Sequence, residues 1–546
     1  MITTETPAAT PRSALRGFNG AARKPASGVQ RPPARAQWLR DTTTGALAAR
    51  RAGIIESRDD VRRVWDRVSA LALDFIQNSG KLRGAVDQVL ADTVGTELKL
   101  NARPDLSELG YSADEAAEWA RMVERRWRQW AWNPAECDSR GKFTLPQLAD
   151  IALRYQIAYG EITGIMEFWP AAKRKQYGVQ SGLKVCLVPP HRLVRDTNEV
   201  EGIYQGVVHD TNGRPTHYRF RERVAGIDTK RDYPARDAAG RPVVIHLFDP
   251  NDAADVRGLS VIAAAMRTYV QSEQLGDATL ATAILQTLFA ATLTSPSPSK
   301  EAFEAIEDLG EIDAELKDDF LGYFGAVLDR ARDDRLSIDN SAKVNHLGPG
   351  EALQLHTAAT PHDNYLPFKS HLDREMARTI GVTASSYTMN HDSATYSSVR
   401  MESATIWPVV VRRRERFAAT MHQIVYENWL DEGIGLGRIP LRGGYRAFQR
   451  YRDAVCWAEW QGPARPTADD FKSAKASTER LQNGTSTLKQ ECAELGLDVN
   501  DVIATRAAEK AKLEAAGLPV PFAKVTGGQP VVQEDAEGEQ EEAEAA

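Results

Sequence analysis

A block of short β-prone runs interrupts an otherwise helical pattern. This change from a helical to a strand-like pattern limits the folds that the chain can adopt. Between residues 164 and 248, runs such as HYRF and VVIHLF are separated by turn-forming residues. Short runs rich in β-branched and aromatic residues are typical of antiparallel strands. On either side, apolar residues recur at the three- and four-residue spacing of a helix. The sequence therefore predicts an α+β fold that is mainly helical.

Two local signals mark the edges of this block. The helical pattern from residue 143 to 159 is followed by Gly160, a residue type that commonly ends helices because it accepts a positive φ angle. Asn212 and Gly213 lie between two strand-like runs and predict a hairpin. Before the block, residues 59–135 are predicted to form a helical shell.

Three tryptophans, Trp127, Trp130 and Trp132, close the predicted shell. We interpret them as core or interface anchors and not as a surface on which bases stack.

After residue 258 the pattern is again helical. A helix with many alanines is predicted from about residue 259 to 289. A second helix is most regular from Pro367 and ends before Gly381. An insertion, residues 290–358, separates the two. Because small residues allow close packing, the pair suits an arrangement of helices around an axis.

A long helical pattern from about residue 398 to 431 contains Pro408, which predicts a kink there. Residues 466–516 are predicted to form two or three helices, with breaks at Asn483-Gly484 and Leu495-Gly496. The segment 382–397, which precedes the long helix, is predicted to be a polar loop.

The two ends of the chain differ in charge from each other and from the body. Residues 1–55 contain nine arginines and lysines but only two acids, whereas the residues from Gln533 onward contain seven acids and no base. Both ends are poor in large apolar residues, so we interpret them as mobile arms, the first basic and the second, residues 521–546, acidic. The net charge of −7 argues against a protein that grips nucleic acid over its whole surface.

The densest basic patch of the body is formed by Arg412, Arg413, Arg414 and Arg416. No aromatic platform is interleaved with it, so we favour a solvated or subunit-facing stripe, paired with acids of a neighbour, over a DNA contact.

Motifs of catalysis and metal binding are weak. No phosphate-binding loop of the nucleoside triphosphatase type occurs, and the GIGLG run at Gly433 follows a helix, where a turn is expected instead of a dinucleotide site. The adjacent residues His391, Asp392 and Ser393 cannot form a catalytic relay by adjacency alone. We expect no catalytic residues, no cofactor and no metal site.

The sequence also bears on where the protein is found. The four cysteines are scattered and are interpreted as reduced thiols. No apolar run reaches the ~18 residues of a membrane span, and the first residues lack the apolar core of a signal peptide. We therefore expect assembly in the host cytoplasm, without a membrane partner.

An ordered series of segments resembles the lambda family of phage portal proteins. The resemblance covers about residues 56–515. Its segments include, in chain order, AVDQVLADTVGTELKL, CDSRGKFTLPQLADIALRYQIAYGE, IYQGVVHDTNGRPTHYRF, RGLSVI, LGPGEALQL, MARTIGVTASSYTMNHDSATYSSVRMES and TADDFKSAKASTERLQNGTSTLKQECAELGLDVNDVIATRAAEK. Residues 251–256 depart from the family pattern, which leaves the start of the first alanine-rich helix open.

The resemblance implies a portal architecture with named parts. They are a wing at 56–258, a stem helix at 259–289, a clip at 290–358, a second stem helix at 359–381, a tunnel loop at 382–397, a long kinked helix with its return to the wing at 398–465, and a crown at 466–520. The tunnel-loop candidates are Ser385, Ser386, Tyr387, Thr388, Met389, Asn390, His391 and Asp392.

The resemblance also implies a function. It predicts a ring, twelvefold in this family, at one capsid vertex of the virion, through which double-stranded DNA is packaged and ejected. The partners that it implies are the terminase large subunit, the head-tail adaptor, and the major capsid and scaffolding proteins. Two alternatives remain: a virion scaffold or connector ring without a DNA channel, and a hydrolase that uses His391 or the region of Cys137.

Overall fold

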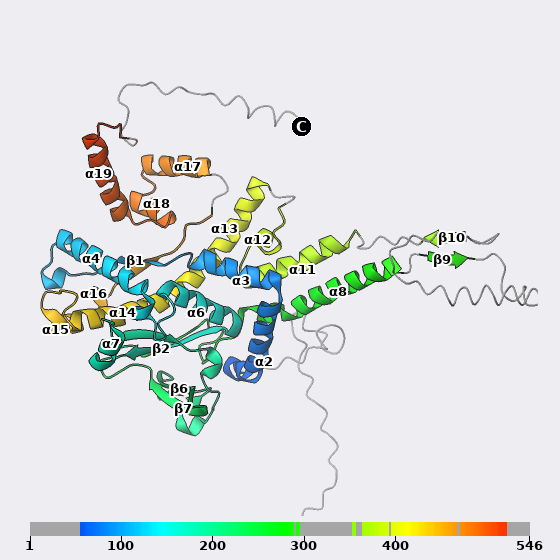
Figure 1. Cartoon of the computed structure of the whole chain (residues 1–546), viewed down its shortest axis with the longest axis horizontal. Coiled ribbons are helices and arrows are strands. Elements are labelled where there is room, and N and C mark those ends of the chain that lie inside the picture. The colour runs from blue at the N-terminus through cyan, green and yellow to red at the C-terminus, as the bar shows by residue number, and fades with distance from the viewer. Residues whose placement is uncertain are drawn as a thin grey trace, which may run out of the picture. The chain divides into compact units, whose positions relative to one another are not determined.

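The computed structural model describes residues 55–288, 291–294, 352–355, 363–391, 395–466 and 470–520 (Figure 1). The basic arm up to residue 54, most of the predicted clip, Asp392 and the acidic tail lie outside the described residues. The chain is mainly helical, with short antiparallel sheets, as the sequence predicts.

The first helices cover one another through aromatic and aliphatic side chains. Capping boxes start two of them, because the side chains of Ser112 and Thr144 accept from the backbone three residues on. Gly160 ends the second of these with φ of 85°, which confirms the predicted helix end. The helices are α2 (Ser57–Asn78), α3 (Gly80–Thr93), α4 (Ala113–Ala131), α5 (Pro134–Cys137), α6 (Leu145–Tyr159) and α7 (Ala171–Tyr177).

One strand lies within the stretch predicted to be a helical shell, and the prediction was wrong there. Strand β1 (Lys99–Ala102) pairs antiparallel with β11 (Ala458–Gln461). The partner strand lies more than 350 residues along the chain, so local periodicity carries no signal for the pair.

The block between residues 161 and 248 forms two antiparallel sheets, as predicted, in the orders β3-β2-β8 and β4-β5-β6-β7. The predicted hairpin joins β5 to β6, and Gly213 provides its positive φ, 80°. The strands are β2 (Glu161–Phe168), β3 (Leu183–Leu187), β4 (Ile203–Tyr204), β5 (Val207–His209), β6 (Pro215–Val224), β7 (Ile227–Pro234) and β8 (Val244–Phe248).

A buried ion pair joins these sheets to the first alanine-rich helix. The Arg257 guanidinium donates to both oxygens of Glu161, from Nε at 2.8 Å, and both side chains are fully buried. Burial alone would raise the pKa of Glu161, but the charge of Arg257 and the hydrogen bonds from Arg257 and His246 lower it to about 2. Arg257 also lies over the ring of Trp65 in α2. The start of the helix, which the sequence left open, is fixed by this pair.

The backbone beside the ion pair leaves no space for a side chain. A Cβ at Gly258 would lie 2.1 Å from the carbonyl oxygen of Gly160. Glycine is therefore required where residues 257–262 cross the end of α6.

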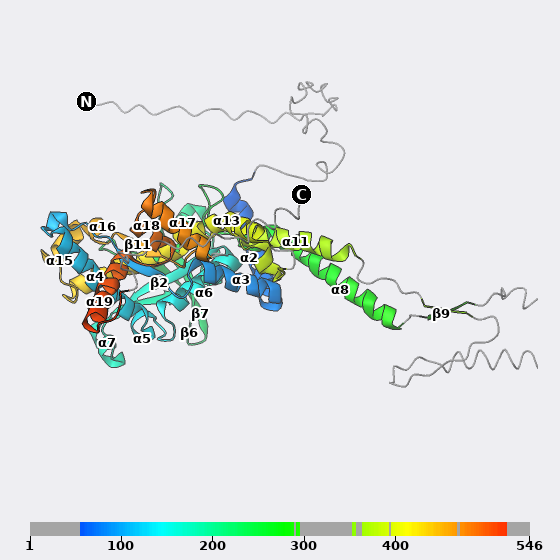
Figure 2. The ribbon, with the colours of Figure 1, turned by 90° about the horizontal axis from the view of Figure 1, so that it is seen from above.

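The alanine-rich helix does not begin at residue 259 as predicted. Residues Val261–Ala265 form a 3₁₀ turn, and the α-helix, α8, runs from Met266 to Leu288. Helix α11 (Tyr365–Ile380) lies beside it, and Gly381 ends α11 with φ of 87° (Figures 1 and 2). Strands β9 (Ala291–Thr294) and β10 (Ala352–Leu355), at the ends of the predicted insertion, pair antiparallel.

The long helix is interrupted in a way that sequence did not indicate. Helix α13 (Tyr396–Arg413) contains Pro408, but it is followed by a π-helical segment, η6 (Arg414–Ala419), before α14 (Thr420–Gly435). The GIGLG run lies at the end of α14, as a turn would, and α15 (Gly444–Arg450) and α16 (Arg452–Val455) follow.

The C-terminal unit contains three helices, α17 (Asp470–Gln482), α18 (Leu488–Glu494) and α19 (Val499–Ala515). Gly484 and Gly496, both with φ of 68°, lie at the two predicted breaks. Arg480 pairs with the Glu491 carboxylate at 2.7 Å across the first break.

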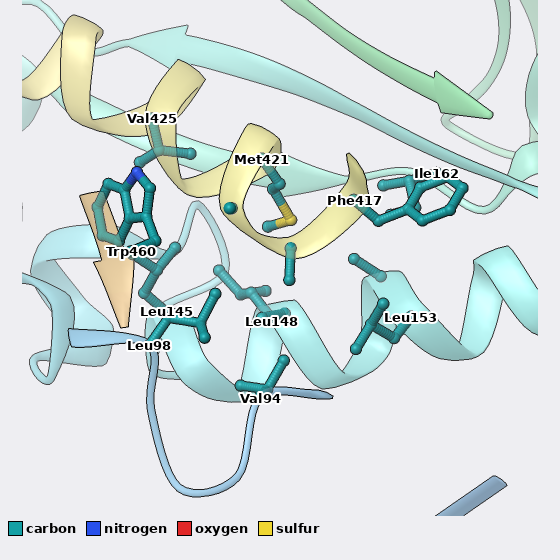
Figure 3. Close-up of a cluster of buried hydrophobic side chains, with 14 of the residues drawn as sticks. Val94, Leu98, Leu145, Leu148, Leu153, Ile162, Phe417, Met421, Val425 and Trp460 are labelled. Atoms are coloured by element: carbon teal, nitrogen blue, oxygen red, sulfur yellow. The ribbon is translucent and has the colours of Figure 1, made fainter. Parts of the chain in front are cut away.

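The main core lies where α6 packs against η6 and α14 (Figure 3). Trp127 and Trp130 are buried in it as predicted and contact Trp429, whereas the ring of Trp132 is partly exposed and its Nε1 donates to Glu97. The residues labelled in the figure are Val94, Leu98, Leu145, Leu148, Leu153, Ile162, Phe417, Met421, Val425 and Trp460.

Replacing Arg257 with Met is expected to destabilise the chain by about 3–5 kcal/mol, because the carboxylate of Glu161 stays buried without its partner. Urea denaturation of the full chain measures the change. The matched control is Arg219→Ala, which removes the more exposed Arg219–Asp232 pair and should cost below about 1 kcal/mol. Equal shifts for the two variants would contradict the role given to the buried pair.

A second prediction concerns acid stability. His422 in α14 is buried, and burial lowers its pKa to about 4 despite a hydrogen bond to Ala418. The unfolded chain takes up this proton at its ordinary pKa near 6.5, so stability is full above pH 6.5 and falls as the pH drops toward 4. The fall is about 3 kcal/mol at ~1.4 kcal/mol per pH unit. His422→Leu should flatten the pH dependence of unfolding over this range, whereas His391→Gln, at an exposed histidine, should leave it unchanged.

Candidate channel segment

The segment that follows Gly381 is more ordered than the predicted polar loop. Residues Ala384–Thr388 form a short helix, α12, and Thr383 caps it by accepting from the backbone NH of Ser386 at 3.1 Å. The prediction of a loop was wrong for these residues. Ser, Thr and Asn side chains bond readily to nearby backbone groups, so the same composition suits a loop and a capped helical turn.

Tyr387 is buried within its own chain, so it does not belong with the side chains that could face a channel. Its hydroxyl lies 3.7 Å from the Met376 sulfur in α11, and burial raises its pKa. Beside it, Lys81 of α3 pairs with the buried carboxylate of Asp373 at 2.9 Å. Tyr387 therefore anchors α12 to α11 and α3.

A second tie holds α12 from the other side. Ser385 Oγ donates to the Glu402 carboxylate of α13 at 2.7 Å. Thr395 starts α13 with a capping box that involves Ser398. The short helix is thus bonded to both helices that flank it.

The remaining tunnel-loop candidates fall into two groups, those bonded within α12 and those exposed to solvent. Ser386 bonds within the cap of α12, and the Thr388 hydroxyl donates back to Ala384. Met389, Asn390 and His391 are exposed, with 78% of Met389 accessible. Met389 has a positive φ of 53°, which turns the chain out of the helix. Among the candidates that the structure describes, the exposed run is therefore Met389, Asn390 and His391, which we name the tip.

Two buried arginines hold the helices behind the segment. Arg413 Nη2 donates to the carbonyl of Ile380 at 2.7 Å, at the C-terminus of α11. Arg414 donates to Thr93 at 2.9 Å and to Asp92 at 3.0 Å, at the C-terminus of α3. Cations are favoured at helix C-termini, where carbonyl groups lack partners. Burial lowers the pKa of Arg413 to about 10, so it stays charged at neutral pH.

The interpretation of the arginine patch as one solvated or subunit-facing stripe was therefore wrong for Arg413 and Arg414. Only Arg412 and Arg416 are exposed, and both pair with Asp249 of the same chain. Consecutive side chains of a helix point in different directions, so a run of arginines need not share one face.

The cysteine that sequence left open as a nucleophile is inaccessible. Cys137 is fully buried, and burial together with the charge of Asp138 raises its pKa to about 12. A thiol in this state does not supply the thiolate that nucleophilic catalysis needs. Within the described ranges the four cysteines are free, and no three His, Cys, Asp or Glu side chains gather as a metal site requires. None of the helices described is both long and apolar enough to cross a membrane.

Comparison with known proteins identifies the family. Residues 43–414 match the family of phage portal proteins of the lambda type, described as "Phage portal protein, lambda family". The chain therefore belongs to the lambda family of phage portal proteins.

Two phage portal proteins match this chain over most of their length. Portal protein B of Escherichia phage lambda is 27% identical over 466 residues, which cover 84% of this chain and 86% of that protein. The portal protein of Escherichia phage N15 is 26% identical over 491 residues, which cover 88% and 91%. Among solved structures, a chain in the neck of an empty gene transfer agent particle, computed with C6 symmetry, gives a TM-score of 0.39 at 12% identity, over 78% of this chain and 93% of that one.

The tie between Ser385 and Glu402 can be tested locally. Ser385→Ala should lower the free energy of local opening by about 1–2 kcal/mol, because a hydrogen bond to a charged group is lost. Amide hydrogen exchange of residues 384–391 should become about tenfold faster. Ser397→Ala, at an exposed serine of α13, is the control. Unchanged exchange in Ser385→Ala would show that Glu402 does not hold α12.

Proposed function

We propose that copies of this chain form a ring, a dodecamer, at one capsid vertex, and that double-stranded DNA passes through its central channel during packaging and ejection. Membership of the portal family supports the ring and the channel. The role is structural, with no catalytic step assigned to the chain.

The observation that carries the proposal is the exposed tip of residues 389–391. The tip is polar apart from Met389, and α11, α12 and α13 hold its base through Tyr387, Ser385 and Arg413. A constriction that contacts moving DNA needs a firm base and an exposed end. We assign this end to the channel.

The charge of the chain suits DNA that slides. Each neutralised phosphate adds affinity and slows release, so a channel must avoid clustered cations. The net charge is −7, and the buried arginines Arg413 and Arg414 donate to backbone carbonyl groups. The side chains at the tip include one histidine and no lysine or arginine.

The parts of the chain take the roles that the family resemblance implies. Residues 56–258 and 398–465 form the wing and its long helix, 259–289 and 359–381 the stem, and 466–520 the crown. The clip, residues 290–358, docks the terminase large subunit and later the head-tail adaptor. The major capsid and scaffolding proteins are further partners, and the assembled protein resides in the virion.

The first test is the mass of the purified chain by light scattering, with negative-stain images of the same sample. We expect about a dozen copies around a central hole. A monomer or dimer at all concentrations would contradict the proposal.

A second experiment separates the channel from a scaffold or connector ring without one. Replacing Met389, Asn390 and His391 with Gly-Ser-Gly should leave the ring intact and reduce the DNA content of assembled particles. The control replaces the exposed loop residues Asn251, Asp252 and Ala253 in the same way. If both variants package DNA as the wild type does, the segment has no channel role.

The hydrolase alternative has its own test. His391→Ala and Cys137→Ala should each leave phage yield within about twofold of the wild type, because neither side chain is assigned to catalysis. A loss of yield in either variant, with normal assembly and a normal DNA content of the particles, would favour the hydrolase.

A further inference from the structure

Helices α8 and α11 use one side each to pack against one another. Thr268 of α8 donates to Glu375 of α11 at 3.1 Å, and Gly276 lies near the side chains of Tyr365 and Lys369. Both views show the two helices side by side (Figures 1 and 2). Near its start α8 also contacts α2, where the rings of Tyr269 and Phe75 lie 4.5 Å apart. Farther along, Asp277 and Leu280 of α8 are exposed.

The outer side of α8 is apolar and acidic, and we name it the acidic face. It consists of Val270, Glu273, Asp277 and Leu280, at helical spacing. At about 100° per residue these positions lie roughly 80–160° around the axis from the midpoint between Thr268 and Gly276, the two positions that face α11. Leu280 is 62% exposed, and Asp277 makes no hydrogen bond or ion pair with any described residue. The hydroxyl of Tyr269 donates to Glu273, which leaves its charge on this face.

The opposite side of the pair is basic, and we name it the basic face. Arg374 and Arg378 of α11, four residues apart, are exposed and make no hydrogen bond or ion pair in the described part of the chain. With Met401 of α13, which is 68% exposed, they line a cleft of about 300 Å³ whose floor includes Val382 and Ile406.

The cleft also contains an acid. Glu402 lines it, and its carboxylate accepts from Ser385 at 2.7 Å. The basic face therefore has two guanidinium groups against one carboxylate, with an apolar floor, and the acidic face has two carboxylates and two apolar side chains.

Charge decides which faces can meet. Two basic faces or two acidic faces would bring like charges together, whereas a basic face and an acidic face are complementary. A contact between two different faces of identical chains is heterologous, so it repeats from copy to copy and closes when the rotation allows a ring.

We propose that the acidic face of one copy binds in the basic face of the next copy, with Leu280 and Val270 against the apolar cleft and Asp277 and Glu273 beside Arg374 and Arg378. The partner is a second copy of this chain. The inference rests on the proposed ring and adds to it the residues that join neighbouring copies beside the channel segment.

The test reverses charge on one face at a time in the full chain. The variants are Arg378→Glu, Asp277→Arg and the combination of both, with Arg67→Glu, an exposed arginine of α2, as the matched control. Light scattering gives the ring fraction at a fixed protein concentration and low salt, and circular dichroism checks that each variant is folded.

Each single reversal should lower the ring fraction about tenfold, because a carboxylate meets a carboxylate or a guanidinium meets a guanidinium. The combined variant should recover most of the wild-type fraction, and Arg67→Glu should not change it. Wild-type assembly in all variants would overturn this interface and leave the proposed ring standing. Loss of assembly without recovery in the combined variant would overturn the pairing of the two faces. If the wild type forms no ring, both the proposed function and this inference fail.

Discussion

The hydrogen bond from Arg413 to the carbonyl of Ile380 is the contact on which the candidate channel segment depends. It joins the end of α11 to the end of α13. The candidate channel segment is the part of the chain that connects these two helices. Arg414, the next residue, does the same for α3. Two adjacent guanidinium groups therefore bond the long helix to the ends of α11 and α3. They lie at the point where the long helix changes from α to π geometry. Bulges of this kind are frequent at functional sites.

A buried ion pair acts at the same end of the helix pair, where the turn at residues 261–265 lies beside α11. Arg257 and Glu161 fix where the chain leaves the sheets, and the 3₁₀ turn at residues 261–265 leads from there into α8. The two helices α8 and α11 thus have one fixed end each, set by the buried arginines Arg257 and Arg413. Beyond their other ends, strands β9 and β10 pair antiparallel.

Much of this framework could be predicted from sequence because its signals are local. Helix ends at Gly160, Gly381, Gly484 and Gly496 need one residue type with a positive φ. The antiparallel block was predicted from short runs and turns in the same way. The pairing of β1 with β11 was missed because the two strands are far apart in the chain. The π segment was missed because the sequence shows no local signal for it.

The sequence located the candidate channel segment, but it did not show which of its side chains are buried and which are exposed. Composition identified a polar stretch between two helices, and family resemblance gave it a role. Neither distinguished Tyr387, which is buried against Met376, from Met389, which is exposed, because both lie in the same polar run. That distinction comes from packing, which a single sequence does not contain.

In the proposed ring, residues 389–391 line the narrowest part. A cryo-electron microscopy reconstruction of the assembled chain gives the distance of each residue from the symmetry axis. We expect Met389, Asn390 and His391 to lie closer to the axis than any other residues of the body. A ring in which this segment faces outward, or in which another segment forms the constriction, would contradict it.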